Sequence, residues 1–311
     1  MELYQLRTFV AVADAGHLTR AAERMHLSQP AVSSHIKAIE QEFDVRLFER
    51  GHSGVALTHA GQKLLEYARR ALRSAEELRH AAKALKGEIA GKVRIGTNSD
   101  PEYIRLGNFL GRAVERHPMV EIELQHEVTG AAFEAVRGGV LDASFYFGDL
   151  TSPSVAGLAL REMAYRVTAP AAWCNRVRKA GWAEIAALPW ILTPSISTHN
   201  QLVTKLFAEH GVEMPTRRIQ ADQEAVIMNL VVSGIGISLM RENIALEKQH
   251  LREVCIWEKA RLCTMLWFIY HANRAGDPLI GALLDVLRET WQLDLPESVA
   301  QNCAPTEHAA T

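Results

Sequence analysis

The sequence predicts a winged helix-turn-helix head, a long linker helix and a two-lobed α/β domain, in this order along 311 residues. Three short helical patterns with tight connections occupy the first 43 residues. An apolar heptad pattern without proline follows and continues to about residue 86. From residue 91 onward, strand and helix patterns alternate, which is typical of α/β domains. A chain of this length is expected to form two or three compact units.

The head, residues 1–58, begins with two helical patterns. The first ends at Gly16, and the second is the short segment LTRAAERMH at residues 18–26. A tight connection, HLSQP, leads into a third helix at residues 28–43. Two short helices joined this closely must cross at a steep angle, with small alanines at the crossing. The arrangement predicts a helix-turn-helix, whose second helix enters the DNA major groove.

The third helix has an apolar side and a polar side. Val32, Ile36, Ile39 and Phe43 are spaced four, three and four residues apart, so we expect this side to pack inward. The opposite side carries serines and a lysine, and Ser28 is expected to cap the helix start. Alone, the pattern also describes a surface helix whose polar side meets only water. The helix-turn-helix context favours contact with DNA.

A wing is predicted after the third helix, in the segment DVRLFERGHSGVALTHAG at residues 44–61. Its glycine-containing loop lies beside Arg46 and Arg50. Arginines at the base of such a loop can reach phosphates or a minor groove. The alternative is a hairpin tip that contacts only solvent.

The linker, residues 59–90, is predicted to be one long coiled-coil helix used for dimerisation. Apolar residues alternate in steps of four and three, at Leu64, Ala68, Ala71, Ala75, Leu78, Ala82 and Leu85. Small alanines let two helices approach closely, which favours pairing between subunits over packing within one subunit. A symmetric dimer would then present two heads to two DNA half-sites.

The remaining chain is predicted to form two similar lobes with a cleft between them. Strand and helix patterns alternate over residues 91–161 and return at 268–296, which we assign to lobe I. Residues 162–267 show the same alternation of strand and helix patterns, and we assign them to lobe II. The alternation predicts a largely parallel sheet. The polar tail at residues 297–311 is expected to be loose.

Composition limits the classes of protein to consider. With 48% hydrophobic and 23% charged residues, the chain is typical of a globular protein. Its net charge is −2, but residues 1–92 hold fourteen Lys and Arg against eleven Asp and Glu, so the N-terminal part is mildly basic. No apolar run has the length of a membrane span and no secretory signal is evident, which predicts a cytoplasmic protein without membrane contact.

The sequence predicts no metal, cofactor or catalytic site. The 13 histidines are dispersed, and no HExxH spacing occurs. The four cysteines, Cys174, Cys255, Cys263 and Cys303, include no CxxC pair and are expected to be reduced thiols. A redox pair of Cys255 and Cys263 is the alternative, which strand-like flanking sequences disfavour.

The first hundred or so residues resemble LysR-type transcriptional regulators. The resemblance rests on AAERMHLSQPAVSSHIKAIE at residues 21–40, LFER at 47–50 and LTHAG at 57–61, in this order. It extends more weakly to GVLDASF at 139–145 and GIGISLM at 234–240. It implies a periplasmic-binding-protein-like effector domain in a homodimer or homotetramer that binds a small-molecule effector in the cleft and changes the bend of promoter DNA. RNA polymerase is a further candidate partner.

The resemblance also implies which residues contact double-stranded DNA. Pro30 and Ala31 would pack on thymine methyl groups, while the serine hydroxyls and Lys37 would take phosphates or base edges. The complete set is Gln29, Pro30, Ala31, Ser33, Ser34, His35, Lys37 and Arg50. Members of the family often carry arginine at the position of Ser34 and glutamine at that of His35, so the operator sequence stays open. Arg241 stands where the family commonly has proline, and would add a charge near the lobe interface.

Effector contacts are expected where strands end, because ligands of α/β sheets bind beyond the carboxyl ends of strands. The resemblance points first to Ser99 and Thr129, facing an effector carboxylate. The expected set is Ser99, Asp100, Thr129, Phe145, Thr198 and His199. Ser99, Asp100 and Thr129 have an alternative role as helix caps. A carboxylate at Asp100 would repel an anionic effector unless it caps its own helix, whereas a zwitterion or a hydroxylated aromatic would avoid the conflict.

Three other classes of protein are alternatives to a ligand-responsive regulator. An enzyme is disfavoured because no nucleophile elbow, phosphate loop, dinucleotide glycine fingerprint or paired metal ligands occur. A transported-solute binding protein is disfavoured by the attached head and by the lack of an export signal. A DNA-binding protein that uses the rear domain only for oligomerisation stays open. The effector, the operator, the direction of regulation and the number of subunits do not follow from the sequence.

Overall fold

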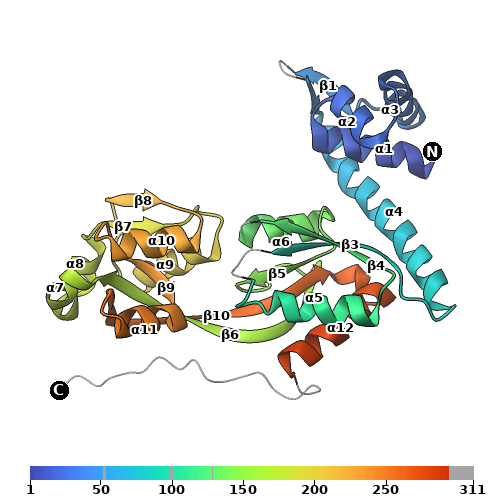
Figure 1. Cartoon of the computed structure of the whole chain (residues 1–311). Helices are drawn as coiled ribbons and strands as arrows, with labels where there is room; N and C mark the ends of the chain where they lie inside the picture. The colour runs from blue at the N-terminus through green and yellow to red at the C-terminus, as the bar shows by residue number, and fades with distance from the viewer. Residues whose placement is uncertain (52–53, 98–100, 128, 294–311) are drawn as a thin grey trace.

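The computed structural model describes residues 1–51, 54–97, 101–127 and 129–293. They form a small head, a linker helix that leaves it, and a larger body of two lobes at the far end of that helix (Figure 1). This order confirms the predicted fold class. The tail predicted at residues 297–311 lies outside the described residues.

The head packs around the apolar side of its third helix. Its helices are α1 (Leu3–Ala15), α2 (Leu18–Met25) and α3 (Gln29–Phe43). Their shared core takes in Phe9 and Val12 from α1 and Ala21 and Ala22 from α2. The helices predicted from the sequence are therefore confirmed.

The apolar side of α3 follows the prediction except at its end. Val32, Ile36 and Ile39 are each 6% exposed or less. Ser28 caps the helix, its Oγ accepting a hydrogen bond from the Ala31 amide at 3.3 Å. The inward position predicted for Phe43 was wrong, since this ring is 41% exposed. It lies in the last turn of α3, on the rim of an apolar groove that opens towards the linker helix.

The predicted wing is a two-stranded antiparallel hairpin of β1 (Phe48–Gly51) and β2 (Gly54–Leu57). It is tied to the turn between α1 and α2, because the Val55 amide donates to the Gly16 carbonyl at 2.9 Å. A Cβ atom on Gly54 would lie 2.4 Å from the Gly16 carbonyl oxygen. The wing therefore needs glycine where it crosses this turn.

The linker is a single helix, α4 (His59–Ala84), capped by Thr58, whose Oγ1 accepts from the Gly61 amide at 2.9 Å. Its first turns belong to the core of the head, where Ala68 is 4% exposed. Further along the predicted heptad seam, Leu78 is 72% exposed and Leu85 is 90% exposed. Within the described part of one subunit, the distal seam is therefore an uncovered apolar side.

The opposite side of α4 docks on lobe I through buried charged groups. Asp277 accepts from His80 Nδ1 at 3.2 Å and from Arg274 Nη2 at 2.5 Å. Arg274 also contacts Asp142 at 2.6 Å, and Arg73 on α4 is 9% exposed. We call these residues, Arg73, His80, Asp142, Arg274 and Asp277, the docking cluster. It fixes the linker to lobe I on one side and leaves the seam open on the other.

One mixed sheet runs through both lobes, in the strand order β4-β3-β5-β10-β6-β9. Its strands are β3 (Gly91–Thr97), β4 (Val120–His126), β5 (Ala143–Phe147), β6 (Val155–Pro170), β9 (Ser238–Arg241) and β10 (Val254–His271). β3 pairs in parallel with β4 and β5, whereas β5–β10, β10–β6 and β6–β9 are antiparallel. The prediction of a largely parallel sheet was wrong because β6 and β10 run in opposite directions between the lobes and pair with each other.

Each lobe has its own core, and the two long strands contribute to both. In lobe I, α5 (Leu106–Arg116) and α12 (Pro278–Trp291) cover one face of the sheet and α6 (Thr129–Gly138) covers the other (Figure 1). Phe268 of β10 lies in this core, while Trp257 of the same strand lies in the core of lobe II.

Lobe II adds a short parallel sheet of β7 (Trp190–Leu192) and β8 (Arg218–Gln220). Its remaining elements are η1 (Ala171–Trp173), α7 (Cys174–Lys179), α8 (Trp182–Ala186), α9 (Thr198–Glu209), α10 (Glu224–Val232) and α11 (Glu242–His250), and η2 (Ala272–Arg274) follows β10.

Cys255 and Cys263 lie apart on β10. Cys255 pairs with Ala169 of β6 and Cys263 with Ala164, so a redox pair between the two does not fit the register. Cys255 is 1% exposed and its thiol contacts that of Cys174. Burial raises the pKa of the Cys255 thiol to about 12, which keeps it protonated at neutral pH.

Candidate nucleic-acid interface and ligand pocket

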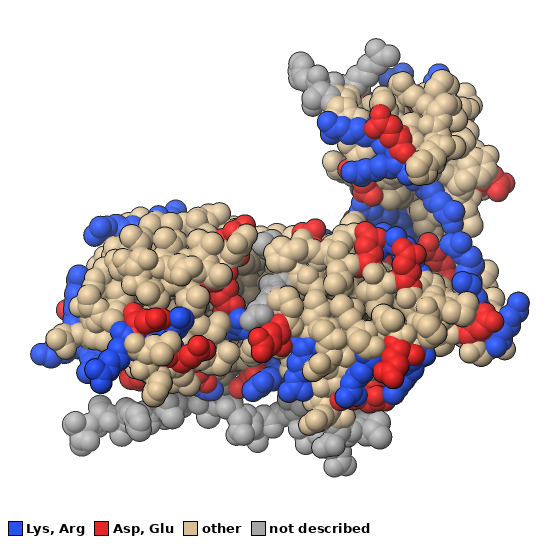
Figure 2. All heavy atoms as spheres, in the orientation of Figure 1, with Lys and Arg blue, Asp and Glu red and all other residues tan. Residues whose placement is uncertain are grey.

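The polar side of α3 points away from the core of the head. Gln29, Pro30, Ser34 and Lys37 are exposed, and Ala31 and Ser33 are half-buried. The helix starts at the surface, where Ser28 caps it and Pro30 stands in its first turn. In Figure 2, Lys and Arg side chains follow α4 from the head towards the lobes, which adds positive charge below the head.

His35, expected to face DNA, is turned partly back onto α1. Its Nδ1 lies 2.9 Å from Thr8 Oγ1, and the Thr8 hydroxyl donates to the Tyr4 carbonyl at 2.9 Å. The Thr8 oxygen therefore accepts from His35 Nδ1–H, which makes Nε2 an acceptor in the neutral ring. The ring also meets the edge of Tyr4, with centroids 4.8 Å apart. His35 thus offers one acceptor nitrogen, which matches the amino groups of adenine or cytosine.

The wing places Arg46 at the surface, where its carbonyl accepts from Thr58 Oγ1 at 2.6 Å. The backbone of Arg50 pairs with Val55 in the hairpin. The side chain of Arg50 lies outside the described residues, and its DNA contact stays a prediction.

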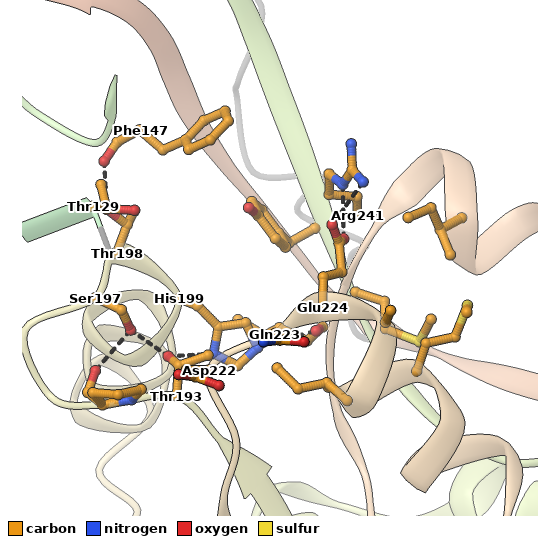
Figure 3. Close-up of a pocket in the computed structure, with 18 of the residues that line it drawn as sticks. Thr129, Phe147, Thr193, Ser197, Thr198, His199, Asp222, Gln223, Glu224 and Arg241 are labelled. Atoms are coloured by element: carbon orange, nitrogen blue, oxygen red, sulfur yellow. Dashed lines mark hydrogen bonds and ion pairs between the residues drawn. The ribbon is translucent and has the colours of Figure 1, made fainter. Parts of the chain in front are cut away.

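A pocket of about 540 Å³ lies between the two lobes. Its walls follow the carboxyl ends of β4, β5, β7 and β8, where such sheets commonly bind ligands. Its volume is in the range of pockets for small molecules. Figure 3 shows Thr129 and Thr198 near Phe147, and Arg241 beside Glu224.

Three of the predicted effector contacts, Thr129, Thr198 and His199, line this pocket. Phe145 does not, because it is fully buried in the core of lobe I, against Phe109 and Phe268. Its neighbour two residues on, Phe147, ends β5 and lines the pocket instead. Ser99 and Asp100 lie outside the described residues.

The hydroxyl groups along the lobe II wall are held by hydrogen bonds within the protein. Thr198 Oγ1 donates to the Phe147 carbonyl and so joins the two lobes (Figure 3). Ser197 Oγ donates to the Pro194 carbonyl at 2.7 Å and accepts from the Asn200 amide at 3.2 Å, which caps α9. These two hydroxyl groups therefore already have partners within the protein.

His199 is neutral at physiological pH. Burial lowers its pKa to about 4, although a hydrogen bond from Nε2 to the Leu239 carbonyl at 3.1 Å acts in the opposite direction. Since Nε2 donates, Nδ1 is the acceptor that faces Thr193 Oγ1 at 3.3 Å. His199 therefore adds no positive charge to the pocket.

Arg241 has its charge matched by a carboxylate of the same lobe. Its side chain is 3% exposed, and Nε and Nη2 bind the two oxygens of Glu224 at 2.7 and 2.6 Å. The guanidinium also lies over the ring of Tyr103, 4.3 Å from its centroid. The expected charge near the lobe interface is thus present as a bidentate ion pair.

Sequence reasoning missed the acidic and apolar residues of the pocket. Glu127 follows β4, and Asp222 and Glu224 follow β8, at the strand ends where the sequence predicts hydroxyl contacts. The signal that could have found them is their position directly after a strand. The apolar lining includes Ile227, Met228, Met240 and Ile244.

The described residues contain no group of three or more His, Cys, Asp and Glu side chains that could hold a metal ion. Among the helices of the described ranges, none combines the length and apolar character needed to cross a membrane.

Comparison with known proteins assigns both parts of the chain. Residues 3–62 match the family model "Bacterial regulatory helix-turn-helix protein, lysR family", and residues 86–292 match "LysR substrate binding domain". A curated relative, HTH-type transcriptional regulator ClcR of Pseudomonas putida, is 32% identical over 253 residues, which cover 79% of this chain and 84% of the relative. By its name, this relative is a transcriptional regulator, the class of protein that the sequence predicts.

Solved structures show the same fold over nearly the whole chain. A full-length OxyR variant from Pseudomonas aeruginosa gives a TM-score of 0.69 at 23% identity and covers 93% of this chain and 95% of its own. Full-length CbnR, a protein solved with its target DNA, gives 0.57 at 22% identity and covers 93% of this chain and 100% of its own. The chain belongs to the LysR family of DNA-binding transcriptional regulators with an effector-binding domain.

Proposed function

We propose that a symmetric oligomer of this chain binds promoter DNA with α3 of each head and that a small molecule in the interlobe pocket controls this binding. The observation that carries the proposal is the polar side of α3, which stays exposed while its apolar side is buried. The pocket of about 540 Å³ at the strand ends supports the effector site. We also propose a cytoplasmic location, which binding of promoter DNA requires.

The DNA contacts divide by position along α3. Gln29, Pro30 and Ala31 lie at its start, where helix-turn-helix proteins approach base edges. Ser33, Ser34 and Lys37 follow on the outward side, and His35 presents one acceptor nitrogen. Arg50 on the wing would take a phosphate or the minor groove.

The exposed seam of α4 supports a dimer formed through the linker helices. Leu78 and Leu85 are mostly exposed in one subunit, and burying such a stripe favours pairing. An apolar groove of about 290 Å³ beside it, lined by residues that include Met1, Phe43 and Tyr67, extends this surface to the head. We propose a dimer through this surface, assembly of two dimers into a tetramer, and RNA polymerase as a further partner.

Footprinting of the purified full-length protein tests the function. We expect a protected tract with two related half-sites in DNA upstream of this gene or its neighbours. Absence of any protected tract in these regions, with correctly folded protein, would overturn the proposal.

We expect Lys37→Ala to weaken binding about equally for all DNA sequences and to reduce the slope of log affinity against log salt by about one unit. The reason is the loss of one phosphate contact and its released counterion. Binding isotherms over a salt series measure both effects. Lys205→Ala, which removes a 68%-exposed lysine from lobe II, is the matched control and should change neither. An unchanged slope in Lys37→Ala would contradict the contact.

Ser33→Ala should instead alter the preference at one base pair, by about 1–3 kcal/mol, and leave the salt slope unchanged. The hydroxyl is half-buried beside the helix start, where side chains approach base edges. Competition binding with single-base operator variants measures the effect. If wild type and variant discriminated equally between the bases at every operator position, Ser33 would not contact a base.

A further inference from the structure

We propose that the interlobe pocket takes a cationic effector, an amine or amidine with an apolar body, in preference to a carboxylate. This inference rests on the proposed role of the pocket as the effector site. Three features of the lining support it: an excess of carboxylates, three donors of lobe II that are already used within the protein, and an apolar wall.

The charged side chains that line the pocket carry a net negative charge. The carboxylates are Glu127, Asp222 and Glu224, and the permanent cation is Arg241, which Glu224 already pairs. Within the described ranges, neither Glu127 nor Asp222 has an ion-pair partner. In a partly enclosed pocket this charge attracts a cation and repels an anion.

Three hydrogen-bond donors of the lobe II wall are engaged within the protein. The Thr198 and Ser197 hydroxyls donate to backbone carbonyls, and His199 Nε2–H donates to the Leu239 carbonyl. A carboxylate ligand requires donors, whereas an ammonium group donates and requires acceptors. The free carboxylate oxygens of Glu127 and Asp222 are acceptors. The arrangement therefore suits a ligand that donates.

The apolar part of the pocket indicates the chemistry of the uncharged part of the ligand. Ile227 and Met228 of α10 and Ile244 of α11 share a wall with Met240, and Phe147 closes the side towards lobe I. Methionine side chains adapt to aromatic or branched groups. A phenyl or alkyl group on a short chain would bury its surface here while its ammonium group reaches Glu127 or Asp222.

Three probes with the same apolar body separate the charge classes: phenethylamine, 3-phenylpropionate and 3-phenylpropan-1-ol. Each is added to the full-length protein, and both melting temperature and calorimetric Kd are measured. We expect phenethylamine to raise the melting temperature by mass action and 3-phenylpropionate to leave it unchanged. The alcohol should bind more weakly than the amine.

Two variants assign the amine to the pocket. Glu127→Gln/Asp222→Asn should weaken phenethylamine binding about three- to tenfold, because both carboxylates are partly exposed to solvent. The control Glu209→Gln/Glu213→Gln removes the same charge from exposed positions of lobe II outside the pocket and should leave the Kd unchanged. Ile227→Trp, which fills the pocket, should abolish binding.

Each other outcome overturns the inference in a distinguishable way. Stabilisation by 3-phenylpropionate that Ile227→Trp abolishes would show an anion site and leave the pocket as the effector site. Stabilisation by the amine that survives Ile227→Trp would place the binding elsewhere. No shift with any probe would refute the amine class, while the footprint decides the DNA-binding proposal separately.

Discussion

Leu78→Glu is expected to convert the oligomer to monomers and to weaken binding to a DNA fragment with two half-sites by about 100-fold or more. Leu78 is 72% exposed on the seam of α4, so the substitution costs the isolated subunit little. In the dimer it would place a carboxylate in the apolar seam of each helix, where charge is unfavourable. Sedimentation equilibrium and titration of a labelled operator measure the two effects.

Ala81→Glu is the matched control for this substitution. It adds the same side chain at an exposed position of the same helix, outside the seam. The control should stay dimeric and bind the operator almost as wild type does. If Leu78→Glu also stayed dimeric, the subunit contact would lie elsewhere; if it became monomeric with unchanged affinity, binding by two heads would be excluded.

Asp277→Ala is expected to lower the free energy of unfolding by about 3–5 kcal/mol, because it removes one of the two carboxylates that pair the buried Arg274 and leaves buried donors of Arg274 and His80 without an acceptor. The Asp277 side chain is fully buried, between His80 and Arg274, and Oδ1 also accepts from the Leu279 amide at 2.9 Å. Chemical denaturation measures the loss. Asp285→Ala on the same helix removes a 66%-exposed carboxylate and should change stability by less than about 1 kcal/mol.

The lowered pKa of Asp277 predicts that the protein loses stability in acid. Burial alone would raise the pKa of Asp277, but the hydrogen bond from His80 and the charge of Arg274 outweigh it and hold the pKa at about 2. Since an unfolded aspartate titrates near 4, the ionised form contributes about 2 kcal/mol above that pH. This contribution is lost as the pH falls from about 4 to about 2. Asp277→Asn keeps the size of the side chain and should flatten the pH dependence there; an unchanged profile would contradict the assignment.

The head could be predicted almost entirely from the sequence because its signals are local. Helix periods, the cap at Ser28 and the short HLSQP connection act over a few residues, and the structure confirms the elements that they predicted. The prediction that Phe43 is buried was wrong because periodicity shows which side of a helix is apolar, but not how far along the helix the neighbouring elements cover that side. The burial of His80 was missed because the heptad pattern describes one side of α4 only, while lobe I covers the other.

The pocket was predictable in position but only partly in its residues. The strand ends were found from the α/β alternation, and Thr129, Thr198 and His199 do meet there. Phe145 was chosen instead of Phe147 because a shift of two residues keeps the same face of a strand, and the sequence does not mark its last residue. Strand direction in the sheet depends on how β6 and β10 cross between the lobes, a long-range property that local patterns do not encode.

Because β6 and β10 each run through both lobes, they determine how the two-lobed body unfolds. Each strand supplies core residues to both lobes, so neither lobe can be excised as an independently folding fragment. The two lobes should therefore melt in one cooperative transition. Changes in their relative orientation must come from bending of these shared strands. The register shifts at Trp257/Arg261 and Leu266/Trp267 mark where the ladder is already interrupted and such bending costs least.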